Sequence, residues 1–223
     1  FTASMGSLAL TKDFINEDFL LIESDTFYER KVLEALDART EGNCFSMTEE
    51  SGSGDECFME TKNGFVTKIT KDRHRVCHFE GEMIGATRIC IDTYKRMIEA
   101  WEHASNPYLN YEYLLMDVTE PLDRPVINFK NLIWGDVDCD EDFKKLQNDI
   151  YPRLRRREDP FDHDKLIMHL HNIFPNEDVS KAEIIQIGGM SNKNFRVNIG
   201  DKSFVLRVPG NGSEGMVERT NEE

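Results

Sequence analysis

The sequence alternates short apolar runs with helix-forming stretches, and this alternation constrains the fold more than any other feature. Residues 19–22 are a continuous Phe-Leu-Leu-Ile run that stops at the acidic turn 23–25 and is followed by a helical pattern over residues 28–38. An uninterrupted apolar run of this length is typical of a strand buried on both faces of a sheet. The succession of strand, acidic turn and helix predicts an α/β architecture.

The middle of the sequence changes to short β-like segments that are separated by turns. The pair Asn63-Gly64 favours the tight turn of a β-hairpin, so we expect an antiparallel part of the sheet here. The small polar residues 51–55 predict a mobile loop. The expected strands are residues 44–47, 57–61, 65–70, 76–79 and 125–129, and the expected helices are residues 2–12, 92–102, 111–119 and 141–156.

The pair Asp159-Pro160 interrupts this pattern and predicts a domain boundary, because a residue before proline is disfavoured in a helix. At 223 residues the chain is also longer than one average domain. We expect a first domain over residues 1–159 and the start of a second over residues 160–223. The second shows a helical pattern over residues 163–174, followed by β-like segments at residues 183–187, 194–199 and 203–208.

The formal net charge of −15 disfavours non-specific binding to nucleic acid, whose phosphates it would repel. No apolar run approaches the roughly 20 residues needed to span a bilayer, so we expect no membrane-embedded segment and a cytoplasmic protein. The five cysteines are scattered without C-x-x-C spacing, which favours reduced thiols. An enzyme that uses a metal-bound nucleotide is compatible with this charge, since Mg²⁺ needs carboxylate ligands.

Two aspartates follow expected strands and are candidate metal ligands. Asp25 comes directly after residues 19–22, and Asp138 follows both residues 125–129 and the apolar residues 132–134. In open α/β sheets ligands bind beyond the carboxyl ends of the strands, so two distant acids can converge at one end of one sheet. Such a pair could hold a divalent ion at a reacting phosphate. The alternative is that each aspartate only caps the helix that follows it.

Three segments resemble motifs of the sugar-nucleotidyltransferase superfamily. Residues 19–25 (FLLIESD) are similar to its strand-and-aspartate segment, residues 133–143 (IWGDVDCDEDF) to its late acidic segment, and residues 82–86 (EMIGA) to the strand that lines its acceptor site. The resemblance covers about residues 1–157 and implies a Rossmann-like sheet. It also implies that Mg²⁺ is held by the two aspartates, Asp25 and Asp138.

The same resemblance implies an acceptor site formed by Glu82, Trp134 and Asp136. An aromatic side chain in such a site could contact a quaternary ammonium group by a cation–π interaction. Core packing is the alternative reading of each aromatic residue. The candidates for an aromatic cage are Trp134, Tyr111, Tyr113 and Phe79.

The family begins with a strand, a G-x-G-x-R loop and a lysine that hold the nucleotide triphosphate, and the printed sequence has no such beginning. The resemblance therefore implies that the chain is an internal piece of a longer protein, with an incomplete first sheet. We expect such a piece to bind nucleotide poorly. Its uncovered strand edges favour association, for example as a homodimer.

A second resemblance lies near the end of the chain. The glycine turn 188–194, the strand 204–210 and the segment 219–222 are similar to the N-terminal lobe of the choline and ethanolamine kinases. Backbone amides in such a turn can approach phosphates, although a Gly-Gly pair between strands is also a common hairpin turn. The resemblance implies a small α+β lobe with ATP-binding residues at Gly188, Gly189, Ser191, Asn192, Asn194, Arg207 and Glu222.

Taken together, the two resemblances imply consecutive reactions. The expected transferase activates phosphocholine with CTP to give CDP-choline and pyrophosphate, and it is fused to a kinase that uses ATP and choline. The catalytic aspartates of a kinase second lobe are absent from the printed sequence, so the chain itself is expected to be inactive. The alternatives are a nucleotidyltransferase for a sugar phosphate or aminoethylphosphonate, and a non-catalytic regulatory module.

Overall fold

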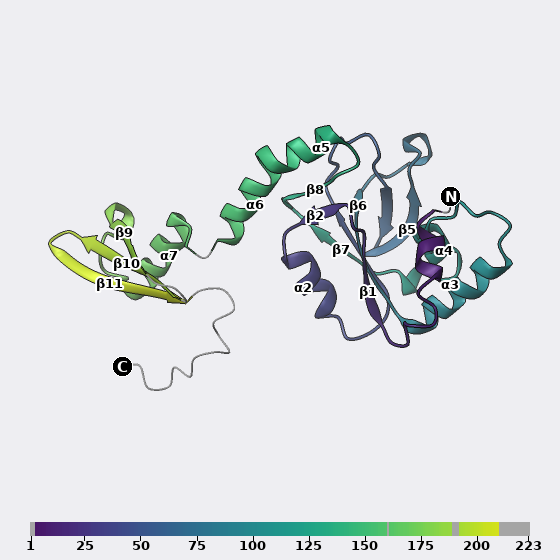
Figure 1. The fold of residues 1–223 in the computed structure, drawn as a ribbon, viewed down its shortest axis with the longest axis horizontal. Helices are drawn as coiled ribbons and strands as arrows, with labels where there is room; N and C mark the ends of the chain where they lie inside the picture. The colour runs from purple at the N-terminus through teal and green to yellow at the C-terminus, as the bar shows by residue number, and fades with distance from the viewer. Residues whose placement is uncertain (1–2, 160, 189–191, 210–223) are drawn as a thin grey trace. The chain divides into compact units, whose positions relative to one another are not determined.

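The computed structural model describes residues 3–159, 161–188 and 192–209. The chain divides into two compact units, Phe1–Leu154 and Arg155–Glu223. Figure 1 shows both units as mixed arrangements of helices and strands, which confirms the expected α/β class. Each unit is described by itself below.

The first unit is built on a six-stranded sheet whose central strand is β6 (Gly81–Ile89). The strand order is β5-β4-β6-β3-β7, and β1 also pairs with β6. Only β3 and β7 are parallel, and the remaining pairs are antiparallel. The other strands are β1 (Phe19–Ile22), β3 (Cys44–Thr48), β4 (Phe58–Lys62), β5 (Phe65–Thr70) and β7 (Val126–Phe129).

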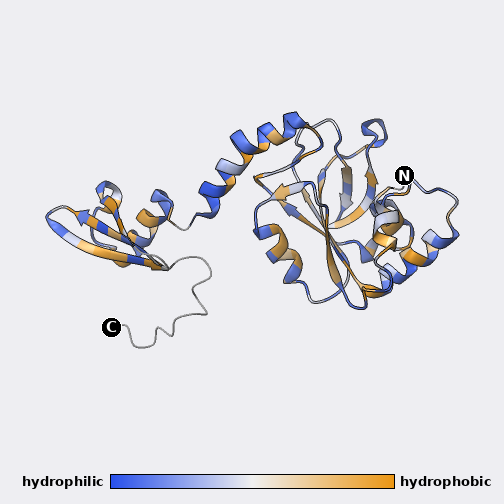
Figure 2. Ribbon diagram, viewed as in Figure 1, coloured by the Kyte–Doolittle hydropathy of each residue, from blue (hydrophilic) through white to orange (hydrophobic). Residues whose placement is uncertain are grey.

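Helices cover both faces of this sheet. Alternate residues of β3 point to opposite sides of the sheet, so the clusters they join show which helices pack on each face. Phe45 and Met47 belong to a large apolar cluster with α1 (Ser4–Ala9), α3 (Ile91–His103) and α4 (Tyr111–Asp117). Cys44 belongs to a second cluster, with Val32 and Leu36 of α2 (Lys31–Asp37). In Figure 2 the strands carry much of the hydrophobic colour of this unit.

The expectation that residues 19–22 are buried on both faces is wrong. β1 is antiparallel to β6, only partly buried, and Ile22 is 49% exposed. It lies on the same edge of β6 as β4, next to Ala86–Ile89, whereas β4 pairs with Gly81 and Glu82. A run without polar residues therefore does not require burial on both faces: here it pairs with one half of an edge of β6, and β4 pairs with the other half.

The expected strand at residues 76–79 is also absent. A 3-10 turn, η1 (Arg73–Arg75), comes first, and β6 begins only at Gly81. The backbone N–H groups of Cys77 and His78 donate to the Glu60 carboxylate, and Lys68 donates to the Arg75 carbonyl. Hydrogen bonds to side chains thus take the place of the backbone hydrogen bonds that a β-strand would form here.

A second, two-stranded sheet joins distant parts of the first unit. β2 (Thr26–Tyr28) is antiparallel to β8 (Trp134–Asp136), with Thr26 opposite Asp136. Neither strand was among the expected ones. The helix expected at residues 28–38 overlaps the end of β2, and this helix in fact begins at Lys31. A small apolar cluster of Phe27 with Ile133, Leu146, Ile150 and Leu154 packs against this ribbon.

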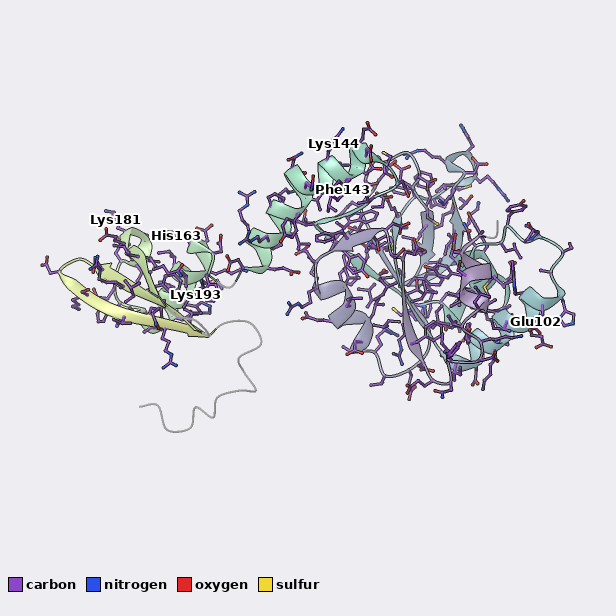
Figure 3. The ribbon with its side chains drawn as sticks, in the orientation of Figure 1. Glu102, Phe143, Lys144, His163, Lys181 and Lys193 are labelled. Atoms are coloured by element: carbon purple, nitrogen blue, oxygen red, sulfur yellow. The ribbon has the colours of Figure 1, made fainter. Side chains whose placement is uncertain are left out.

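The expected helix 141–156 is a succession of three helical segments: α5 (Asp140–Lys145), the π-helical turn η3 (Leu146–Ile150) and α6 (Tyr151–Glu158). This stretch is mostly hydrophilic in Figure 2. Phe143 is an exception, since it is 49% exposed on α5, where Figure 3 labels it. A short 3-10 helix, η2 (Pro121–Asp123), precedes β7.

The second unit contains α7 (His163–Ile173), the 3-10 turn η4 (Val179–Lys181) and a three-stranded antiparallel sheet. The order is β11-β10-β9, with β9 at Glu183–Gly188, β10 at Asn192–Ile199 and β11 at Lys202–Pro209. Leu166 and Leu170 of α7 pack on the sheet in one apolar cluster. Lys193, labelled in Figure 3, lies over the Phe161 ring at 6.0 Å from its centroid.

Within the described ranges, no helix is both long and apolar enough to cross a membrane.

Candidate acidic ligand-binding site

The first unit contains a polar cavity of about 220 Å³. Seven carboxylates line it together with a single lysine, so its electrostatic potential favours a cation or a cation-bound ligand. The charged lining residues are Glu23, Asp25, Asp55, Lys71, Glu82, Glu112, Asp136 and Asp138. Uncharged lining comes from Ser4, Thr26, Cys57, Met83, Ile84, Gly85, Asn110 and Trp134.

The acidic turn after β1 is fixed by backbone bonds to β6 and to the β2–β8 ribbon. The Glu23 N–H donates to the Gly85 carbonyl at 2.9 Å, and the Val137 N–H donates to the Asp25 carbonyl at 3.0 Å. The second bond continues the β2–β8 register beyond Thr26 and Asp136. Residues that are more than a hundred positions apart in sequence therefore meet at one cavity.

Gly85 is where β6 bends beside the cavity. Its φ of +77° lies in the region that favours glycine, and the register between β3 and β6 shifts across this point. A Cβ atom at position 85 would lie 2.9 Å from Glu23 Oε2 and 2.9 Å from Thr26 Cγ2. The bend brings the acidic turn close to β6 because no side chain stands between them.

We expect Gly85→Ala to lower the free energy of unfolding of the first unit by about 1–3 kcal/mol, from backbone strain and the clash with Glu23 and Thr26. Gly64→Ala is the matched control, because Gly64 has a φ of +82° but open space around its Cβ position. Urea unfolding followed by tryptophan fluorescence measures both. Equal losses for the two variants would mean that the close approach at Gly85 has no energetic weight.

Glu82 is the most deeply buried of the cavity carboxylates, at 2% exposure. Burial raises its pKa to about 7, although the Ser51 N–H at 2.6 Å and the Ser51 Oγ–H at 2.9 Å donate to it and oppose the rise. Near neutral pH this carboxyl is therefore divided between its protonated and ionised forms.

Three further acids of the cavity have raised pKa values. Burial is the main cause for Glu23, whose carboxylate also accepts a hydrogen bond from the Tyr111 hydroxyl. Burial raises the pKa of Glu112, which is 4% exposed, and that of Asp136, where the neighbouring charge of Asp138 adds to the effect. Crowded, partly dehydrated carboxylates of this kind are stabilised when a cation binds.

Lys71 is the one cation among the lining residues. Its Nζ lies 2.7 Å from Asp55 Oδ2 in a half-exposed ion pair. Burial disfavours the charge of Lys71, but the hydrogen bond and the charge of Asp55 outweigh it and raise the pKa of the lysine. The ammonium group therefore stays charged and can attract an anion into the acidic cavity.

Asp25 and Asp138 line the same cavity, and both lie at one end of the two-stranded β2–β8 sheet. They flank the two-stranded β2–β8 ribbon, outside the six-stranded sheet. Neither caps a helix, since the residue before α2 is Arg30 and the residue before α5 is Cys139. Within the described part of the chain, no donor binds either carboxylate.

Two exposed carboxylates without protein donors fit a cation that prefers oxygen ligands. Mg²⁺ in phosphoryl-transfer sites is commonly held by one or two carboxylates, with waters and substrate phosphates as the other ligands. No group of three or more His, Cys, Asp or Glu residues forms a complete metal cage in the described ranges. Two carboxylates alone leave most of the coordination positions of such an ion open to other ligands.

The expected acceptor residues Glu82, Trp134 and Asp136 line this cavity as well. The aromatic cage is smaller than expected. The Tyr111 hydroxyl lies among buried groups near Thr87, the Tyr113 hydroxyl accepts the Lys71 N–H, and Phe79 stacks edge-on with Phe58. Of the four aromatic candidates, only Trp134 is a lining residue.

Sequence reasoning missed four charged lining residues: Glu23, Asp55, Lys71 and Glu112. Glu23 stood in the acidic turn that was noted only for Asp25. The others come from a glycine-serine loop, the end of β5 and the start of α4, and no local spacing connects them.

The residues expected to bind ATP lie in the second unit. Gly188 ends β9 with a φ of +130°, and Asn194 is directly opposite Arg207 in the β10–β11 register. The backbone of Asn192 opens β10. Gly189, Ser191 and Glu222 lie outside the described residues.

Solved structures similar to this chain are nucleotidyltransferases. The inositol-1-phosphate CTP transferase from T. maritima is similar with a TM-score of 0.57 and 15% identity, over 69% of this chain and 63% of that one. A putative glucose-1-phosphate thymidylyltransferase from Bacillus anthracis, in complex with a sucrose, gives 0.50 and 12%, over 65% and 59%. CTP:phosphocholine cytidylyltransferase from Streptococcus pneumoniae gives 0.48 and 15%, over 66% and 63%.

At these identities the first two likenesses establish a shared fold: the chain has the mixed α/β architecture of these transferases. The chain spans less than two thirds of the length of each of the three structures. No protein-family model matches it.

Proposed function

We propose that this chain carries the acceptor-binding and metal-binding part of a nucleotidyltransferase that transfers CMP from CTP to phosphocholine. The observation that carries the proposal is the acidic cavity, which combines two unpartnered aspartates, one lysine and one tryptophan. It occurs in a fold shared with a CTP transferase for a small phosphorylated alcohol.

The charges of the cavity suit a phosphorylated acceptor. Asp25 and Asp138 would hold Mg²⁺, which supplies charge neutralisation at the reacting phosphates. Lys71 would hold the acceptor phosphate, because it is the one lining group with a positive charge. Without Mg²⁺ and the positive charge of Lys71, the seven carboxylates of the lining would repel any phosphate.

In the proposed reaction, an anionic oxygen of the acceptor phosphate attacks the α-phosphorus of CTP. A new P–O bond forms, the bond to the β-phosphate breaks, and pyrophosphate leaves with its electron pair. The attacking oxygen already carries a negative charge, so no general base has to remove a proton. The side chains of the cavity would act by orienting the acceptor and balancing charge.

The number of carboxylates favours an acceptor that is also cationic. Glu23, Glu82 and Glu112 are more than one metal ion needs, and a quaternary ammonium would interact favourably with their charge. The Trp134 ring could add a cation–π contact. A sugar phosphate presents neutral hydroxyl groups and would gain less from this surplus of negative charge.

We further propose that the second unit begins a choline-kinase-type lobe that uses ATP and choline. Gly188 favours this, because its positive φ at the end of β9 suits a turn in which backbone N–H groups can approach phosphates. Asn194 on β10 and Arg207 on β11 form a cross-strand pair. ATP-dependent phosphorylation of choline by the full-length gene product is the expected activity.

The test is an assay of pyrophosphate release by the full-length gene product. We expect CTP with phosphocholine to exceed CTP with glucose-1-phosphate by about 10²-fold in kcat/KM, since mismatched polar and charged groups would be left unpaired. UTP and 2-aminoethylphosphonate are the further arms. Comparable rates with a sugar phosphate would favour that acceptor class, and no turnover with any pair would favour a non-catalytic module.

A further inference from the structure

The lysine that lines the cavity is already engaged by the protein itself. Asp55 belongs to the glycine-serine loop between β3 and β4, and its carboxylate lies 2.7 Å from Lys71 Nζ. Both residues line the cavity. A carboxylate therefore stands where an anionic group of a ligand would have to bind this ammonium.

The same loop is held at two other points, one of which is on the cavity wall. Ser51 donates from its backbone and its hydroxyl to Glu82, and Glu50 forms an ion pair with Arg73. The Arg73 guanidinium is itself held over the Phe58 ring, 5.3 Å from its centroid. These contacts anchor the first half of the loop, whereas Asp55 and its pair with Lys71 hold the second half.

Between the anchors the backbone has room to change shape. Gly52 and Gly54 have φ values of +71° and +96°, and nothing lies within 4 Å of a Cβ built at either position. Glycine loses little energy when φ changes sign, so this part of the loop can move while Ser51 stays bound. The ion pair of Asp55 with Lys71 is half exposed, at 61% and 45% of the respective side chains, and such pairs are weak.

We propose that the loop from Glu50 to Asp55 is an autoinhibitory lid, in which Asp55 occupies the phosphate position on Lys71 until a phosphorylated ligand displaces it. The identity of that ligand as a phosphate rests on the proposed function. A phosphate monoester carries a charge of about −1.5 to −2 at neutral pH and can compete with a single carboxylate for the ammonium. Binding would then release the second half of the loop.

The test compares ligand affinities in the 223-residue chain by calorimetric titration with phosphocholine and with inorganic phosphate. We expect Asp55→Asn to bind both ligands about 3–10-fold more tightly than the wild type, since the loss of a weak ion pair frees Lys71. Glu80→Gln is the control, because Glu80 is an exposed acid that neither belongs to the loop nor lines the cavity, so its replacement removes one charge and leaves the lid and its anchors intact. It should change affinity by less than about 2-fold.

A second measurement follows the loop itself. The Ser53 and Asp55 amides donate to hydroxyl groups within the loop, so their hydrogen exchange should accelerate when phosphate binds the wild type. In Asp55→Asn the exchange should be fast from the start. Lys71→Met should abolish binding and the exchange response together.

The proposal is overturned if Asp55→Asn binds phosphate no more tightly than Glu80→Gln, if phosphate slows exchange in the loop, or if no variant binds phosphate. These results are independent of turnover. Phosphate binding with the expected order of variants, but no nucleotidyl transfer by the full-length gene product, would remove the proposed function and leave the lid. Transfer without a difference between the two variants would do the reverse.

Discussion

Replacing either Asp25 or Asp138 with Asn is expected to lower kcat for nucleotidyl transfer by about 10²-fold or more in the full-length gene product. Asparagine keeps the size of each side chain but removes the charge that would hold Mg²⁺ at the reacting phosphates, a contribution of several kcal/mol in comparable sites. Both aspartates are exposed and neither caps a helix, so the fold should persist. Initial rates over a range of Mg²⁺ concentrations measure the effect.

Asp140→Asn is the control for this experiment. Asp140 is an exposed acid in the first turn of α5, close to Asp138 in sequence, and it does not line the cavity. It should retain nearly the wild-type rate. A loss of less than about 3-fold for Asp25→Asn and Asp138→Asn, or an equal loss for Asp140→Asn, would remove the metal assignment, because a lost transition-state charge contact costs far more.

The second large effect concerns stability and its dependence on pH. The pKa of Glu82 is about 7 in the folded chain, above the ordinary value of 4.5, because burial penalises the ionised form. A group with a raised pKa stabilises the fold fully below the ordinary value, and this contribution is lost as the pH rises through about 7. Between pH 5 and pH 8 the wild type should therefore lose stability that Glu82→Gln retains.

The difference corresponds to about 2–4 kcal/mol in the free energy of unfolding, from the size of the pKa rise. Urea unfolding at pH 5 and pH 8 measures it, and tryptophan fluorescence reports the first unit because Trp101 and Trp134 both lie there. Glu99→Gln, an exposed substitution on α3, is the control and should follow the wild type. If the free energy of unfolding changed with pH in the same way for the wild type and Glu82→Gln, the raised pKa of Glu82 would be contradicted.

The elements that could be predicted from sequence are those with a strong local pattern. Helices α3 and α4 and the hairpin β4–β5 were expected within a few residues, since helical periodicity and the Asn63-Gly64 turn are local signals. The prediction that residues 19–22 are buried on both faces was wrong, because an apolar run alone does not distinguish a fully buried strand from a partly buried one that pairs on one side only. The strand predicted at residues 76–79 is absent because the backbone there donates to the Glu60 carboxylate and not to a neighbouring strand.

The site was only partly predictable for a related reason. Asp25 and Asp138 were connected through resemblance, but the ribbon that joins them consists of two three-residue strands with no alternating pattern. Lys71 and Glu112 reach the cavity from the end of a strand and the start of a helix, where polar residues are usual. Their roles depend on tertiary contacts that no spacing in the sequence encodes.

The most direct test of the acidic cavity as the acceptor site uses the two tryptophans of the chain. Trp134 lines the cavity, whereas Trp101 lies on α3 and does not. The chain is labelled with fluorotryptophan and titrated with phosphocholine in the presence of Mg²⁺, and the two fluorine resonances are followed by NMR. We predict a saturable shift of the Trp134 resonance with the Trp101 resonance unchanged; an unmoved Trp134 resonance at millimolar phosphocholine, or equal shifts of both, would contradict the account.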